Sequence, residues 1–91
     1  MENKVLIKLT IPELDRKFDI FIPVNEIIWK IKKIILKSIT DLTGITLDPK
    51  LEYEIFNKDN SKFYKNNEIV IDTDIRNGCE LILLTKLSAF G

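Results

Sequence analysis

Only a few residues of this chain belong to types that carry out covalent chemistry. The sequence of 91 residues contains no histidine, which excludes a Ser/His/Asp triad, a Cys/His pair and a histidine-bound metal. Its one cysteine, Cys79, has no histidine to activate it and no second thiol for an internal disulfide. We interpret Cys79 as a buried or strand-edge thiol.

Asp72 and Asp74 are the closest approach to a paired carboxylate site. They lie two residues apart in a polar loop without a third converging ligand, so we interpret them as turn and capping groups. The three glycines, Gly44, Gly78 and Gly91, lie too far apart for a phosphate-binding loop. These residue types predict a protein that is not an enzyme and that needs no metal or cofactor.

The composition predicts one small domain over residues 1–91, with residues 86–91 as a flexible tail. Hydrophobic residues make up 45% of the chain and charged residues 31%, enough for one thin core. Basic and acidic residues number 14 each, so no net charge draws the protein to nucleic acid, and we expect at most peripheral membrane contact. The longest apolar run, Leu81 to Leu84, is far too short to cross a membrane, and no signal-peptide core follows Met1. We expect a cytoplasmic protein, at most at the inner face of the cell membrane.

Alternating apolar residues predict the strands of a sheet. The expected strands are 4–11, 17–22, 51–55, a short strand within 61–64, and 80–85. In the third of these, Leu51, Tyr53 and Ile55 are expected to point inward. Gly78 can adopt a positive φ before the last strand.

A helical period follows the second strand. Asn25 is expected to cap a helix that begins at Glu26 and stops near Gly44. Its apolar residues fall in one arc of the helical wheel. The members of this predicted buried arc are Val24, Ile27, Ile28, Ile31, Ile34, Ile35, Ile39 and Leu42.

The order of these elements predicts an α+β fold, a mixed four- to five-stranded sheet with one helix packed on one face. This order resembles the ubiquitin-like β-grasp, and the run from Ile71 to Leu84 resembles it in sequence as well. More narrowly, the chain resembles the YukD/EsaB group of bacterial ubiquitin-like proteins. That group shares the opening strand, the Phe18–Val24 approach to the helix and an Ile-x-Asn/Asp-Gly-x-x-Leu ending, here Ile75 to Leu81.

The resemblance implies a small cytoplasmic accessory of a type VII (ESX/WXG) secretion machine, with protein partners among its membrane components and no catalytic residues. Conjugating ubiquitin-like proteins and sulfur carriers instead need a C-terminal Gly-Gly, whereas this sequence ends in Ser88-Ala89-Phe90-Gly91. A modifier or sulfur carrier activated at the C-terminus is the alternative interpretation. A structural homodimer subunit is a further one.

On the predicted helix, two apolar residues fall outside the buried arc. Trp29 and Leu36 project to another side of the helix, beside Lys32 and Lys33. We predict that this side binds a protein partner, with Trp29 as the energetic centre and the lysines as a charged rim. The alternative is that Trp29 packs under a loop or against Phe90.

A second apolar group is expected on the sheet face away from the helix, where alternation places Leu6, Phe21, Phe56, Ile82 and Leu84. In the ubiquitin-like arrangement the first and last strands are neighbours, so Leu6 is expected beside Ile82 and Leu84. The result would be one contiguous patch for docking or self-association, with local edge packing as the alternative.

Four lysines, Lys30, Lys32, Lys33 and Lys37, give the helix a positive outer side. We interpret it as a solvated polar face. Each lysine would also strengthen contact with anionic lipid, whereas nucleic-acid binding requires a denser basic surface.

Overall fold

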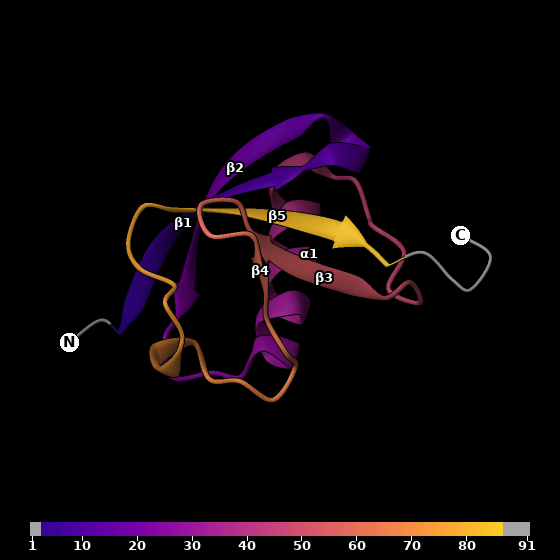
Figure 1. Cartoon of the computed structure of the whole chain (residues 1–91). Helices are drawn as coiled ribbons and strands as arrows, with labels where there is room; N and C mark the ends of the chain where they lie inside the picture. The colour runs from indigo at the N-terminus through magenta and orange to yellow at the C-terminus, as the bar shows by residue number, and fades with distance from the viewer. Residues whose placement is uncertain (1–2, 87–91) are drawn as a thin grey trace.

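The computed structural model describes residues 3–86 and confirms the predicted α+β fold, with one helix on a mixed five-stranded sheet (Figure 1). The strands are β1 Lys4–Ile11, β2 Arg16–Pro23, β3 Tyr53–Asn57, β4 Lys62–Phe63 and β5 Cys79–Thr85. The α-helix is α1 Ile28–Thr43, and two 3₁₀ turns cover Pro12–Leu14 and Val70–Asp72. Within the described residues no helix is long and apolar enough to cross a membrane.

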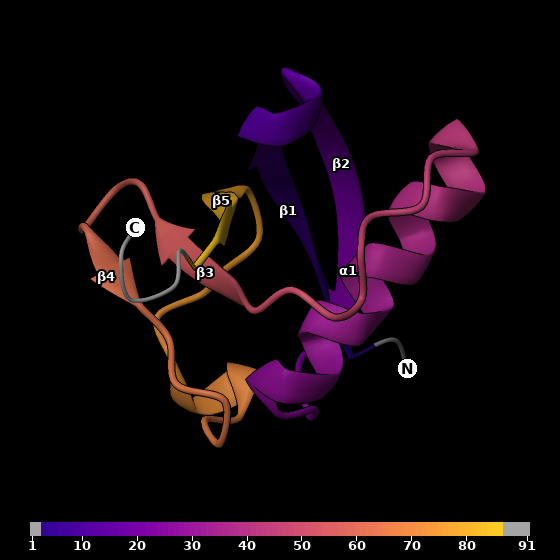
Figure 2. The ribbon, with the colours of Figure 1, turned by 90° about the vertical axis from the view of Figure 1, so that its right-hand side faces the viewer.

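The strands lie in the order β2-β1-β5-β3-β4. The two central strands, β1 and β5, run parallel, and every other neighbouring pair is antiparallel. Figure 2 shows α1 lying along one face of this sheet. Because side chains alternate along each strand, one face of the sheet supplies the core beneath the helix. The fully buried members from β1, β2, β3 and β5 include Ile7, Leu9, Ile22, Ile55 and Leu81.

The helix begins two residues later than the sequence predicted, and the prediction that Asn25 caps it is wrong. The residue before the helix is Ile27, which makes no side-chain cap and forms an isolated β-bridge with Ile69. The first two helical N–H groups instead donate to backbone carbonyls of a distant segment. The N–H of Ile28 donates to Glu68 at 2.8 Å and that of Trp29 to Asn66 at 3.1 Å. A tertiary contact therefore replaces the local cap.

The buried face of the helix is narrower than predicted. Its core residues are Ile28, Ile31, Ile35 and Ile39, whereas Leu42 is 62% exposed. The prediction for Leu42 is wrong because Leu42 lies beside the edge strand β2, where it lines an open hollow with Ile20 and Phe21. The predicted stop is confirmed: Gly44 has φ +74° and its N–H donates to the carbonyl of Thr40 at 2.8 Å.

The predicted inward position of Leu51 is also wrong. A turn at Asp48 keeps Leu51 out of the sheet, because the Leu51 N–H donates to the Asp48 carbonyl at 3.3 Å and the Lys50 N–H to its carboxylate at 2.9 Å. Leu51 is 43% exposed, and β3 begins only at Tyr53. The inward positions of Tyr53 and Ile55 are confirmed.

A polar network closes the end of the sheet near β4. The buried Tyr64 hydroxyl donates to the Asp74 carboxylate at 2.5 Å and accepts a bond from the Asn57 amide at 2.9 Å. Asp74 is therefore an anchor for Tyr64 and not only a turn residue. The bond from Tyr64 is the main reason that the pKa of Asp74 lies below its usual value, and burial is the main reason that the pKa of Tyr64 is raised.

Cys79 is the first residue of β5 and is partly buried, which confirms a strand-edge thiol. Its sulfur accepts a weak hydrogen bond from the Asn57 amide at 3.4 Å. Burial raises the pKa of the thiol above its ordinary value. The thiol is therefore protonated at neutral pH and is not activated as a nucleophile.

Candidate functional site

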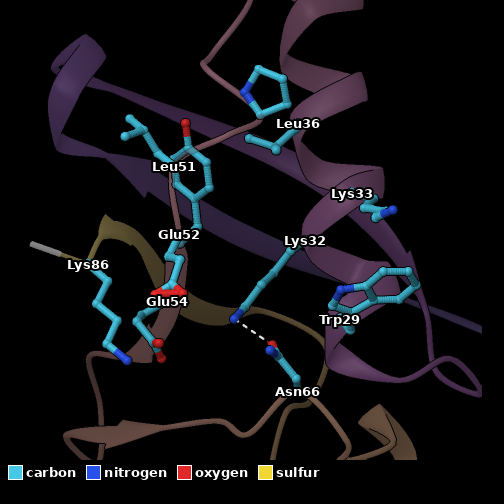
Figure 3. Close-up of a pocket in the computed structure, with 11 residues that line it drawn as sticks. Trp29, Lys32, Lys33, Leu36, Leu51, Glu52, Glu54, Asn66 and Lys86 are labelled. Atoms are coloured by element: carbon cyan, nitrogen blue, oxygen red, sulfur yellow. Dashed lines mark hydrogen bonds between the residues drawn. The ribbon is translucent and has the colours of Figure 1, made fainter. Parts of the chain in front are cut away.

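The four helix residues predicted to bind a partner line one pocket. Trp29, Lys32, Lys33 and Leu36 form its helical wall, and the pocket has a volume of about 320 Å³ (Figure 3). Their spacing of three, four and seven residues places them on one side of α1. The opposite wall comes from the chain before and within β3, from the segment after β4 and from the end of β5. These further lining residues are Pro49, Leu51, Glu52, Tyr53, Glu54, Asn66 and Lys86.

The two apolar helix residues have different surroundings. Trp29 is 46% exposed, and the Lys33 ammonium lies 4.1 Å from the centre of its ring, a cation–π contact. Leu36 is partly buried and packs against the core. The pocket therefore has a firmly packed apolar base and an accessible aromatic rim. Phe90, the alternative partner for Trp29, lies outside the described residues.

Asn66 joins the two walls of the pocket, and sequence reasoning missed it. Its backbone carbonyl accepts the Trp29 N–H at 3.1 Å, and its side-chain oxygen accepts a bond from the Lys32 ammonium at 2.7 Å (Figure 3). Asn66 thus fixes the position of two helix residues at once. Only its place in a polar bend was visible in the sequence.

The pocket is lined by charges of both signs. Lys32 and Lys33 lie on the helix wall, whereas Glu52, Glu54 and Lys86 lie together on the opposite wall (Figure 3). Burial is the main cause that lowers the pKa of Lys32, the two glutamates partly offset it, and Lys86 adds to it. This wall of the pocket is open because β4 pairs only with Phe56 and Asn57, which leaves the first half of β3 as an unpaired edge on that side.

Lys86 belongs to the ordered edge of this site. Its N–H donates to the Glu52 carbonyl at 2.8 Å, one step beyond the β3–β5 ladder. The rest of the expected tail, residues 87–91, lies outside the described part of the chain.

The other candidate surface, the outer sheet face, is not one contiguous patch as predicted. Thr10 of β1 lies opposite Ile82, which places Leu6 beside Gly78 and four residues away from Ile82. Leu6 is instead paired with Phe21 of β2. A row of charged residues, Asp19, Lys8 and Glu80, crosses β2, β1 and β5. This row divides the predicted patch into two apolar groups, a smaller one of Leu6 and Phe21 and a larger one of Phe56, Ile82 and Leu84. The prediction that Leu6 adjoins Ile82 and Leu84 is therefore wrong.

The larger of the two apolar groups contains a residue that sequence reasoning missed. Phe56 lies opposite Ile82 and packs against Phe63 of β4 in a tilted arrangement, with ring centroids 4.8 Å apart. Phe63 is 51% exposed. It also lines a second hollow that shares Lys32, Glu54 and Asn66 with the pocket, so this group and the pocket adjoin at the β3 edge. Leu84 lies opposite Glu54, on the same strand pair.

The remaining helix lysines form ion pairs with carboxylates one helical turn away, Lys30 with Glu26 just before α1 and Lys37 with Asp41 inside it. Lys30 lies 3.7 Å from Glu26 and Lys37 lies 3.6 Å from Asp41, at the spacing of one helical turn. Such exposed pairs contribute little to stability. They also neutralise much of the positive face outside the pocket, as expected for a solvated surface.

The chain matches no known protein-family profile and no curated protein sequence. Among solved structures, a de novo design based on ubiquitin has a TM-score of 0.67 at 18% identity, covering 98% of this chain and 96% of the design. The ubiquitin-like domain of Plasmodium falciparum Dsk2 has a TM-score of 0.67 at 16% identity, covering 91% and 99%. A chain of the MycP5-free ESX-5 inner membrane complex has a TM-score of 0.69 at 11% identity, covering 96% of this chain and 22% of that one.

These similarities identify the fold class. The chain has the ubiquitin-like β-grasp, with α1 on one face of a mixed sheet whose two parallel strands are central.

Proposed function

We propose that this protein is a non-catalytic protein-interaction module that binds its partner through the pocket between α1 and β3. The observation that carries the proposal is the half-exposed Trp29, held under Lys33 at the rim of a pocket with apolar and charged walls. Such a combination is typical of an interface hot spot.

The partner we propose is a membrane component of a type VII secretion machine, with this protein as a cytoplasmic accessory or regulator. Two observations support this assignment. The sequence resembles the YukD/EsaB group, and the fold is similar to part of a chain in an ESX-5 inner membrane complex. The outer sheet face, with Phe56 and Ile82, is a second candidate contact surface.

Crosslinking of the native protein in its own cells, followed by mass spectrometry of the linked peptides, tests this proposal. We expect secretion-membrane components to be captured by wild type and lost with Trp29→Ala/Leu36→Ala. Leu42→Ala is the matched control, because Leu42 is an exposed apolar residue on the same helix that does not line the pocket. Circular dichroism must show that all variants are folded.

Three results would overturn the proposal. Full capture by a folded Trp29→Ala/Leu36→Ala variant would exclude the pocket, and Leu6→Asp/Ile82→Asp would then test the sheet face. Conjugates joined through Gly91 in the presence of ATP would indicate a modifier. A concentration-dependent dimer in sedimentation, with no other partner captured, would indicate a structural homodimer.

A further inference from the structure

One cation in the pocket, the Lys32 ammonium, is partly buried without a carboxylate partner among the described residues. The Lys32 ammonium is partly withdrawn from water, and its hydrogen bond at 2.7 Å goes to the neutral amide oxygen of Asn66. Among the described helix lysines, Lys30 and Lys37 have carboxylate partners within 4 Å, whereas Lys32 has none among residues 3–86. In agreement with this partial burial, the pKa of Lys32 is lowered. A desolvated cation without an ion pair is stabilised by any anion that reaches it.

The pocket as a whole carries the same imbalance. Three lysines, Lys32, Lys33 and Lys86, and two glutamates, Glu52 and Glu54, line it. The formal charge of the lining is thus +1, because three positive charges exceed two negative ones. A single carboxylate brings it to zero. The two glutamates both come from the β3 side, so an incoming anion is directed to the helix side, where Lys32 and Lys33 lie (Figure 3).

The rest of the lining requires an apolar group beside that anion. Trp29 and Leu51 are 46% and 43% exposed, and Leu36 and Pro49 complete the apolar surface. A free inorganic anion would leave this surface in water. A peptide segment with an apolar side chain next to an acidic one would cover it and satisfy Lys32 together.

We propose that the pocket binds an acidic segment of the partner protein, in which a carboxylate pairs with the Lys32 ammonium while a neighbouring apolar side chain covers Trp29 and Leu36. The inference rests on the proposed function, because it names the chemistry of the partner that the same pocket binds.

Two crosslinking reagents separate this inference from the proposed function. An amine-reactive crosslinker with a long arm captures a partner near the pocket whatever its charge. A carbodiimide joins an amine directly to a carboxylate in contact with it, without a spacer. The expected result with carbodiimide is an amide bond between Lys32 or Lys33 and an Asp, Glu or C-terminal carboxyl of the partner, located by mass spectrometry.

Affinity measurements then quantify the role of Lys32. A synthetic peptide containing the crosslinked segment is titrated against the full chain, with the emission of Trp29, the one tryptophan in the sequence, as the signal. We expect Lys32→Met to weaken binding by about tenfold or more, as loss of a charge-assisted hydrogen bond does. Lys32→Arg should retain binding, and Lys30→Met is the matched control outside the pocket. The same peptide with its acidic residues changed to Asn or Gln should bind as weakly to wild type as the original binds to Lys32→Met.

Each other outcome contradicts the inference. If the long-arm reagent captures a partner at the pocket but Lys32→Met binds it as tightly as wild type, the proposed function stands and the inference that the partner binds through an acidic segment is wrong. If neither reagent captures a partner, the proposed function fails and the inference fails with it. If Lys32 is required for sedimentation with phosphatidylglycerol vesicles while no protein is captured, the anion is a lipid headgroup and the inference is wrong.

Discussion

Replacing Tyr64 with phenylalanine removes one hydroxyl from a buried network and should cost much of the stability of the domain. Tyr64 is 2% exposed, and its hydroxyl bonds the Asp74 carboxylate and the Asn57 amide. A hydrogen bond to a charged group contributes about 1.5–3 kcal/mol, and an under-satisfied buried donor costs about 1 kcal/mol more. We expect a loss of about 3 kcal/mol at pH 7, from the about 5–15 kcal/mol typical of native domains.

Urea denaturation followed by circular dichroism measures this loss. Tyr53→Phe is the matched control, because the Tyr53 hydroxyl donates to a neutral acceptor, the Asp48 carbonyl, at 2.7 Å. We expect that control to cost about 1 kcal/mol. A thermal scan should show a correspondingly larger drop in Tm for Tyr64→Phe, at about 4–8 °C per kcal/mol for a domain of this size.

The pH dependence distinguishes the charged bond from simple packing. The bond from Tyr64 is the main cause that lowers the pKa of Asp74 from its ordinary 3.8. The stability that this bond contributes is therefore present above about pH 4 and is lost as the pH falls through the folded-state pKa. The difference between wild type and Tyr64→Phe should narrow below pH 4, and that of Tyr53→Phe should not. Equal costs for the two variants, or a Tyr64→Phe cost that is constant from pH 7 to pH 2.5, would refute the reasoning.

Three further predictions concern the helix end, the sheet face and the pocket. Gly44→Ala should lower the free energy of unfolding by about 1 kcal/mol, measured in urea. The reason is the φ of +74° at this position, since an added Cβ would meet no atom within 4 Å. Gly44→Asn should cost clearly less, and equal costs for the two variants would argue against a conformational origin. Phe63→Ala should cost about 1 kcal/mol more than Phe21→Ala, an exposed aromatic on the far edge strand, because Phe63 packs against Phe56; no difference would show that the ring pair contributes nothing. Burial disfavours the charged form of Lys32 in the folded state, so the stability of Lys32→Met relative to wild type should fall as the pH rises from 8 to 10.5, and a flat difference in Tm would contradict it.

Local patterns predicted the elements of the fold because they depend on neighbours in sequence. The alternation from Lys4 to Ile11 defined β1 to the residue, and Gly44 marked the helix end. The helix start could not be predicted in the same way. It depends on Asn66 and Glu68, whose carbonyls replace the Asn25 cap.

The outer face shows a second limit of sequence patterns. Alternation has a period of two, so every even offset between β1 and β5 preserves a buried inner face. The offsets differ only in which outer residues become neighbours. The actual register puts Thr10 opposite Ile82, and Leu6 is left with Phe21.

The sequence predicted the helix wall of the candidate site but not the wall that faces it. Helical spacing alone brought Trp29, Lys32, Lys33 and Leu36 together, because they share one element. The facing residues come from other elements, and Asn66 is 34 positions away from Lys32. Their place in the pocket follows from the open edge of β3, which no local pattern encodes.

The segment that caps α1 also restricts what the pocket can admit. Widening the pocket on the Asn66 side would withdraw a carbonyl from the Trp29 N–H and leave the first turn of the helix to fray. A guest that fits without this movement meets walls that are already ordered, so little conformational entropy is lost on binding. A bulkier guest that displaced Asn66 would break this bond to the helix. Binding at the pocket is thereby linked to the stability of the helix terminus, and we expect an occupied pocket to slow hydrogen exchange at the Trp29 amide.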